Sequence, residues 1–417
     1  MKQVFLFIIG LVLFQTVYSQ TEKTDNWNND LDYLVKVLSK KHYNFFTIRN
    51  KEDFLSGIDA IKLESKNLND FQIALKTQQL IAKFGDSHTM LNYSQMYDRN
   101  QILPIRLLWT SDGLHILHTT LENKELLGSQ LLSINKVPIA TIIDSLCTMA
   151  TIDNQASIKV LIPKILFSFQ VLEYFGFTDT KQVELEVKTN SNQNLVYILE
   201  PFEMNRNNEI SFKPDSVSFC MKNVSAFFTD FYYPDEKIYY MLYNRCWSRE
   251  IERFRNRKRA KTMPSFKDFK EKAFNVLENK PVEKIIFDMR FNGGGNSIQG
   301  TRFIKKLSKF LKANPTIKTY VVLGSSTFSS AILNAMDFKR LTNAIFVGEE
   351  TAGKPNHFGE VKSFQLPNSK LYVNYSTKYF KRTEENVSTI KPDIVIEMSF
   401  SDFTNGIDPV YEWVKKQ

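Results

Sequence analysis

The stretch Asp288-Met289-Arg290-Phe291-Asn292-Gly293-Gly294-Gly295-Asn296 is the most informative part of the sequence. It follows the apolar run Lys284–Phe287, which is typical of a buried strand, and it precedes a segment with helical periodicity. Consecutive glycines allow positive φ angles and a close approach of the backbone to a ligand. Their amides can converge on an anion or an oxyanion. Because the spacings of the phosphate-binding loops are absent, the stretch indicates either an oxyanion site or a plain flexible turn.

The chain on both sides of this turn alternates strands with helices, which predicts an α/β domain over residues 237–417. Strands are expected at 238–243, 284–287 and 319–323. Two helices are expected from apolar residues that share one face: Phe266, Phe269, Ala273, Phe274 and Leu277 in the first, and Phe303, Ile304, Leu307 and Phe310 in the second. A third helix should begin near Ser329.

A serine-rich segment, Gly324-Ser325-Ser326-Thr327-Phe328-Ser329-Ser330-Ala331, connects the last of these strands to its helix. A serine at a helix N-terminus lies near free backbone amides and the positive end of the helix dipole. That position suits a nucleophile whose intermediate carries an oxyanion. Serine is also an ordinary helix cap, and composition alone favours the cap.

A third motif, Gly85-Asp86-Ser87-His88-Thr89, follows a helical region. A histidine with polar neighbours after a helix-ending glycine is a candidate general base, although an isolated histidine is more often structural. His115 and His118 have no third ligand at a recognisable spacing, so we expect no metal site.

The spacing of apolar residues divides the remaining chain into two further domains and a linker. Residues 20–98 show helical spacing, with a helix over 71–84 that Asn69 and Asp70 could cap. Residues 99–200 carry short β-type runs and one helix, over 139–149. Within them, residues 128–135 (GSQLLSIN) resemble the core of a PDZ module. Residues 201–236 are predicted to be a linker.

The N-terminus indicates export. Lys2, the apolar run Val4–Leu13 and the small residues before Gln20 form the pattern of a secretory signal peptide over residues 1–19. No later segment has ~18 consecutive apolar residues, so we expect no stable membrane insertion after cleavage. The expected location is the periplasm or the extracellular space.

Composition narrows the class of protein further. The 417 residues are too apolar for a disordered chain and allow two or three domains. The three cysteines are too few and too far apart for a disulfide scaffold or a zinc site, which leaves one disulfide or three free thiols open. Residues 249–272 contain ten Lys/Arg and four Asp/Glu, but an exported protein rarely meets nucleic acid, so we expect no nucleic-acid partner.

Taken together, the motifs resemble the tail-specific (C-terminal-processing) serine peptidases, in particular their tricorn-like branch. The resemblance covers most of the chain and depends on the joint order of its marks: GDSHT (85–89), YYMLYN (239–244), IIFDMRFNGGGN (285–296), LGSSTFSSA (323–331), VGEETAGKPNHFGE (347–360), QLPNS (365–369) and KPDIVI (391–396). It implies an α/β multidomain protein with a helical N-terminal domain, a PDZ-like middle domain and a crotonase-like catalytic domain.

The resemblance assigns a role to each matching residue. Ser329 would be the nucleophile, and backbone amides of Gly294, Gly295 and Ser330 would bind the oxyanion. His88 would be the base, with Ser87 beside it and an acidic residue, Glu385 or its neighbour Glu384, completing the site. No cofactor is implied, and the substrate would be a peptide or an unfolded chain end.

Three alternatives stay open. Lys354 lies 25 residues after Ser329, the spacing of the Ser–Lys branch, but that branch tends to have Glu where this chain has Ile332. We therefore prefer His88. The chain could instead be a non-catalytic binder of lipophiles or peptides on the same scaffold. A third hypothesis is a surface protein that adheres through its basic stretch. The sequence does not predict the oligomeric state.

Overall fold

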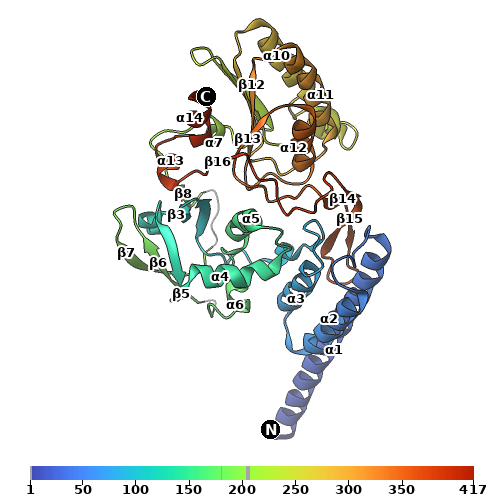
Figure 1. Ribbon diagram of the computed structural model, residues 1–417. Helices are drawn as coiled ribbons and strands as arrows, with labels where there is room; N and C mark the ends of the chain where they lie inside the picture. The colour runs from blue at the N-terminus through green and yellow to red at the C-terminus, as the bar shows by residue number, and fades with distance from the viewer. Residues whose placement is uncertain (1, 180, 203–206) are drawn as a thin grey trace. The chain divides into compact units, whose positions relative to one another are not determined.

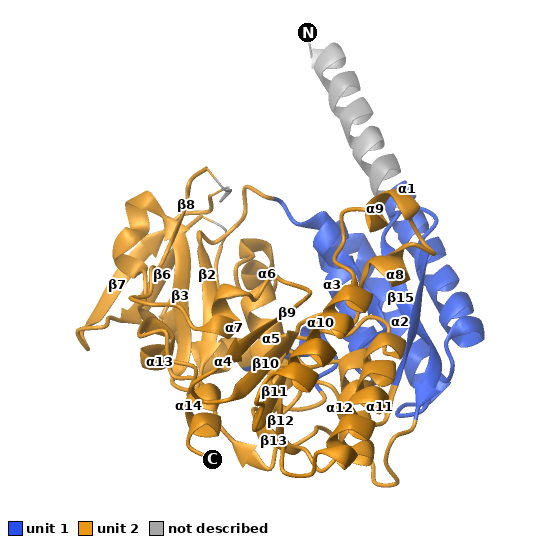
Figure 2. Ribbon diagram, turned by 90° about the horizontal axis from the view of Figure 1, so that it is seen from above, with its two compact units in different colours: residues 1–98, 144–152, 358–380 blue, residues 99–143, 153–357, 381–417 orange. Residues whose placement is uncertain are grey.

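The computed structural model describes residues 2–179, 181–202 and 207–417, with side chains described from Glu22 onward. The predicted signal peptide, residues 1–19, falls outside the described side chains and stays a prediction. The described chain forms a mixed α/β protein with several sheets and two compact units (Figure 2). Unit 1 comprises residues 1–98, 144–152 and 358–380, and unit 2 comprises residues 99–143, 153–357 and 381–417.

Unit 1 is helical, as its sequence predicts, but it also includes strands from much later in the chain. Its helices are α1 (Lys2–Lys41), α2 (Lys51–Glu64) and α3 (Asp70–Ala82), and α3 begins with a capping box between Asn69 and Gln72. A sheet of β1 (Met90–Leu91), β15 (Tyr372–Phe380) and β14 (His357–Gln365) adds its apolar side chains to the helical core. The sequence analysis placed these later strands in the catalytic domain.

One sheet of unit 2 is built from the β-rich part of the chain. Its path runs through β2 (Ile105–Thr110), β3 (Gly113–Thr120), β4 (Gln130–Ile134), β6 (Val183–Lys188) and β7 (Asn194–Leu199). The short strands β5 (Val137–Pro138) and β8 (Glu209–Ser211) pair with β4 and β3. Helices α4 (Ile139–Leu146), α5 (Gln155–Ile165) and α6 (Phe169–Tyr174) connect β5 to β6. The short β-type runs predicted in this region are confirmed as strands.

The second sheet of unit 2 positions the candidate site. Among the described residues its strand order is β16-β13-β12-β11-β10-β9, with β9 antiparallel to β10 and the other pairs parallel. The strands are β9 (Phe228–Tyr233), β10 (Ile238–Tyr243), β11 (Lys284–Asp288), β12 (Lys318–Leu323), β13 (Ile345–Gly348) and β16 (Ile394–Val395). The strands predicted at 238–243, 284–287 and 319–323 are thereby confirmed.

Helices cover both faces of this sheet, which explains why β10 is apolar at nearly every position (Figure 1). Side chains of α10 (Phe266–Asn279), α11 (Ile298–Ala313) and α12 (Ser330–Leu341) share one core with Tyr239 and Met241. Side chains of α7 (Phe219–Lys222) and α14 (Pro409–Lys415) share the other with Tyr240 and Leu242.

Two stretches differ in detail from their predictions. Residues 201–236, predicted to be a linker, include β8, α7 and the edge strand β9, because the aromatic residues of β9 favour a pleated, half-buried surface. The basic stretch 249–272 folds into α8 (Arg249–Glu252), α9 (Arg257–Ala260) and the start of α10. Cys147, Cys220 and Cys246 are free thiols, which decides the alternative that the sequence left open.

Candidate active site

Ser329 has an unusual backbone conformation at the start of α12. Its φ and ψ are 54° and −121°, whereas a serine cap normally has an extended conformation. A residue other than glycine at positive φ is held there at a cost, and such strain concentrates at functional sites. The Ser329 hydroxyl makes no capping hydrogen bond to the described residues of α12. Ser329 is thus not an ordinary helix cap, although composition alone favours that interpretation.

The glycine turn after β11 lies directly against Ser329. A Cβ atom added to Gly294, whose φ is 101°, would lie 2.9 Å from the Ser329 Cβ and 3.0 Å from the Ser330 amide nitrogen. Gly295, with φ 133°, passes still closer to the Cys246 carbonyl, and its own carbonyl accepts a 2.8 Å hydrogen bond from the Ser330 hydroxyl. Only glycine permits this approach. The structure therefore brings Ser329, Ser330, Gly294 and Gly295 together.

Asn292 holds the glycine turn in place. Its buried amide donates a 2.7 Å hydrogen bond to the Tyr243 carbonyl on β10, and its Oδ1 accepts a 2.9 Å bond from the Gly294 amide. Its own carbonyl accepts a bond from the Phe328 amide, which joins the two turns. Because the Gly294 amide already donates to Asn292, the amides of Gly295 and Ser330 are the better candidates for oxyanion donors.

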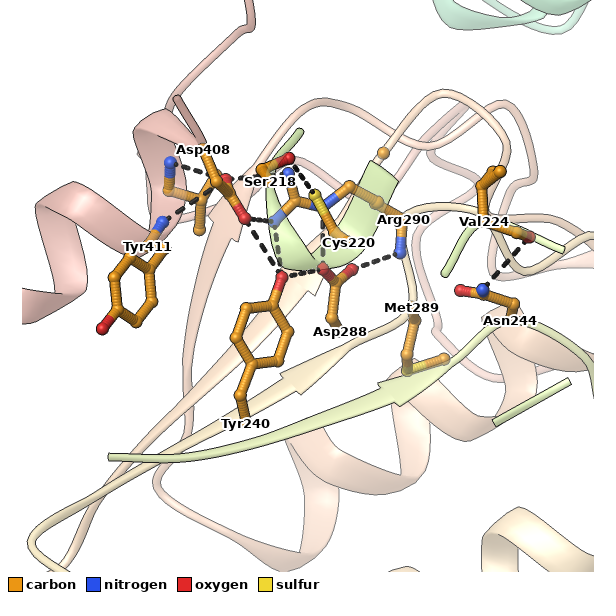
Figure 3. Close-up of polar contacts among 12 residues, drawn as sticks. Ser218, Cys220, Val224, Tyr240, Asn244, Asp288, Met289, Arg290, Asp408 and Tyr411 are labelled. Atoms are coloured by element: carbon orange, nitrogen blue, oxygen red, sulfur yellow. Dashed lines mark hydrogen bonds and ion pairs between the residues drawn. The ribbon is translucent and has the colours of Figure 1, made fainter. Parts of the chain in front are cut away.

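A buried charge cluster anchors the start of the same turn (Figure 3). Arg290 forms an ion pair with Asp288 at 2.8 Å and two 3.0 Å hydrogen bonds with Asp408, which caps α14. The Tyr240 hydroxyl donates to both carboxylates. Burial raises the pKa of Asp288. Burial also acts on Asp408, but the charge of Arg290 together with hydrogen bonds from Arg290 and the Tyr411 amide outweighs it, so the pKa of that carboxyl is lowered. The sequence analysis missed Tyr240 and Asp408 as partners of this turn.

The GDSHT motif forms a compact polar cluster within unit 1. Asp86 is buried, its Oδ1 accepts a 2.9 Å hydrogen bond from the His88 amide, and its Oδ2 accepts a 2.6 Å bond from the Thr89 hydroxyl. His42, which the sequence analysis gave no role, lies with Nε2 3.0 Å from Asp86. The His88 side chain is 8% exposed, and its Nδ1 lies 3.8 Å from Asp86. Ser87 is half-buried on the same turn.

The Asp86 cluster should make unit 1 sensitive to acid. Burial alone would raise the pKa of Asp86, but hydrogen bonds from His42, Ser376, Thr89 and the His88 amide outweigh it and lower the pKa to about 2. The ionised carboxylate therefore stabilises the fold above pH ~4, and this contribution is lost as the pH falls toward 2. We expect Asp86→Asn to lower the free energy of unfolding by about 2 kcal/mol at pH 7. The difference between wild type and this variant should become smaller at pH 2. An equal difference at both pH values would contradict the assignment.

The other predicted site residues have different surroundings. Lys354, in unit 2, lies 2.5 Å from Asp153, a carboxylate whose side chain is 5% exposed. The turn that precedes Lys354 contacts the serine turn, because the Gly353 amide donates to the Thr327 carbonyl. Glu385 is exposed, and Glu384 is 93% exposed and pairs with Lys381.

A cavity of about 330 Å³ opens at the carboxyl ends of β11, β12 and β13 in unit 2. Its walls are mostly apolar and include Trp109 of β2, Val160 of α5, Phe291, Ser325 and Met398. The carboxyl edge of a parallel sheet is the usual place for a ligand in an open α/β fold.

Comparison with solved structures identifies the fold. Mature CPAF complexed with lactacystin matches with a TM-score of 0.62 at 12% identity, over 94% of this chain and 98% of that chain. The chain shares its fold with CPAF. A second structure of mature CPAF gives a TM-score of 0.59 at 12% identity, over 94% and 97% of the two chains. CPAF is a tail-specific protease, so the resemblance drawn from the sequence is confirmed at the level of the fold.

The identity to the CPAF structures is low, and the other comparisons add little at the level of sequence. The photosystem II D1 C-terminal processing protease also matches, with a TM-score of 0.39 at 11% identity over 89% of this chain and 92% of that chain. No family model and no curated protein matches the chain. Within the described residues, no helix is both long and apolar enough to cross a membrane.

Proposed function

We propose that the protein is an exported serine endopeptidase that hydrolyses peptides or unfolded chain ends in the periplasm or outside the cell. The observation that carries the proposal is the conformation of Ser329, a non-glycine residue at positive φ, packed against a glycine turn. A strained serine on a strand-to-helix turn is how a nucleophile is exposed beside oxyanion donors in other hydrolases. The CPAF fold supports the same reaction class.

In the proposed mechanism the Ser329 hydroxyl attacks the scissile carbonyl while His88 accepts its proton. The amides of Gly295 and Ser330 stabilise the oxyanion of the tetrahedral intermediate, and Gly294 allows the turn to approach. His88 then protonates the leaving amine, and water hydrolyses the acyl-enzyme by the reverse sequence.

The surroundings of Lys354 support His88 as the base. A general base needs a free lone pair, whereas the Lys354 amine is in contact with the buried Asp153 carboxylate as an ammonium would be. Lys354 then acts as a structural ion pair beside the serine turn. Ser87, one residue before His88, would help to orient the imidazole. Glu384 and Glu385, the two acidic candidates from the family resemblance, are both exposed, which does not favour either as the partner of His88.

The β-rich part of unit 2 would present the substrate. We propose that it acts as a PDZ-like module, that the α/β part is crotonase-like, and that an extended peptide adds to an edge strand, β2 or β7. Such binding depends on backbone hydrogen bonds and tolerates many sequences, which suits unfolded chain ends.

Labelling with a serine-directed fluorophosphonate tests the proposal. We expect wild type to be labelled, and Ser329→Ala and His88→Ala to lose labelling at least 100-fold, because both nucleophile and base are needed for attack. Lys354→Met should be labelled within a fewfold of wild type. Loss of labelling in Lys354→Met with retention in His88→Ala would replace His88 by Lys354.

A second candidate function is the binding of an apolar ligand without catalysis, and the cavity of about 330 Å³ favours it. Folded wild type that resists labelling but binds a fluorescent fatty-acid probe saturably would support this alternative. Competition by an unlabelled apolar peptide would then distinguish a peptide binder from a lipophile binder.

A further inference from the structure

The carboxylate best placed to assist His88 is its own neighbour, Asp86. The family resemblance expects the acidic partner near Glu385, whose side chain is exposed. Asp86 has a side chain that is 3% exposed, and its Oδ1 lies 3.8 Å from His88 Nδ1. A buried carboxylate interacts more strongly with an imidazolium than an exposed one, because less water screens the charges.

Asp86 is fixed and kept ionised by several donors. The His88 amide and the Thr89 hydroxyl donate hydrogen bonds to its carboxylate, and His42 Nε2 lies 3.0 Å from its Oδ2. His42 and His88 are the titratable groups that face it. This arrangement leaves the carboxylate no freedom to turn away, and so it can hold a neighbouring ring in one orientation.

The hydrogen bonds of His42 indicate its tautomer. Its Nδ1 accepts a 3.0 Å hydrogen bond from the Asn44 amide, so in the neutral ring the proton is on Nε2. Nε2 lies 3.0 Å from Asp86 and therefore donates to it. The ring is fully buried and lies edge-on to Phe45 and Phe358. His42 thus has no lone pair left to act as a base, and its role is to orient Asp86.

We propose that Asp86 is the positioning carboxylate of the catalytic histidine, held in turn by His42, and that Glu385 does not have this role. The inference rests on the proposed function. Asp86 lies on the Nδ1 side of the His88 ring, so Nε2 is the ring nitrogen that would take the serine proton. When His88 takes that proton, Asp86 stays ionised and stabilises the imidazolium, so no proton passes to Asp86.

The test compares Asp86→Asn with Glu385→Gln in peptidase assays over a pH range. Asparagine keeps an acceptor for the His88 amide and removes the charge. We expect kcat to fall about 100-fold or more with KM within about threefold, and the acid limb of the kcat/KM profile to move to lower pH. Glu385→Gln should stay within about threefold of wild type. The reverse result for the two variants would overturn the inference.

Two further measurements keep the test separate from folding and from the proposed function. His42→Gln, which retains an N–H donor, should recover part of the activity that His42→Ala loses, whereas equal loss in both variants would argue against an orienting role. An NMR titration of the His88 imidazole needs no activity. It should move to lower pH in Asp86→Asn, and an unchanged titration in folded protein would overturn the inference even if Ser329 is labelled. Absence of labelling in wild type with a shifted titration would instead count against the peptidase function alone.

Discussion

Replacing Gly294 by alanine should reduce peptidase activity by at least 100-fold. The new Cβ would lie within 3.0 Å of the Ser329 Cβ, the Phe328 carbonyl oxygen and the Ser330 amide, and φ 101° is strained for alanine. The new Cβ would displace neighbouring atoms, and these belong to the nucleophile Ser329 and to the Ser330 amide, a candidate oxyanion donor. Loss of one such donor alone costs roughly 100- to 1000-fold in kcat. The measurement is kcat on a peptide substrate together with the rate of fluorophosphonate labelling.

The adjacent glycine is a matched control. A Cβ at Gly293 would meet nothing within 4 Å, so Gly293→Ala should keep activity within a fewfold of wild type. Circular dichroism should show that both variants are folded. If Gly294→Ala were as active as Gly293→Ala, the close approach of the two turns would have no catalytic meaning.

Replacing Arg290 by methionine should have the largest effect on stability. The change leaves Asp288 and Asp408 buried close to one another without their cation. Breaking a buried ion pair by removing one partner costs about 3–5 kcal/mol. We therefore expect a fall of that size in the free energy of unfolding of unit 2, measured by urea denaturation at neutral pH.

A surface pair provides the comparison for Arg290. Lys267 and Glu271 lie one turn apart on α10, 3.8 Å from each other and well exposed, so Lys267→Met should change stability by less than about 1 kcal/mol. Similar losses in the two variants would mean that the cluster around Arg290 is energetically no different from a surface pair.

Local patterns predicted the elements well because they depend on neighbouring residues. A continuous apolar run is enough to place β10, the helical period of apolar side chains places α10, and Asn69 with Gln72 marks the start of α3. The turn with Gly294 is likewise visible in the sequence, since only glycine allows so close a backbone approach. What it approaches, Ser329, follows from the resemblance and not from the spacing.

Long-range contacts could not be predicted in this way. The hydrogen bond between His42 and Asp86 and the pairing of Arg290 with Asp408 join residues 44 and 118 positions apart. No periodicity encodes such pairs. The positive φ of Ser329 could not be predicted either, because a serine before a helix is ordinarily a cap with extended backbone. Tyr240 gave no distinctive signal, because β10 carries three buried tyrosines and only Tyr240 contacts Asp288 and Asp408.

The assembly of unit 1 from three chain segments has a consequence for biosynthesis. Leu366, Val373 and Tyr375 complete the core that α1, α2 and α3 begin, and they follow α3 by more than 280 residues. A ribosome that makes ~5–20 residues per second needs tens of seconds to reach them. During that interval the three helices can pack on one another, but the part of their core that these later residues cover has no native partner. The helical unit is therefore expected to be completed among the last parts of the protein.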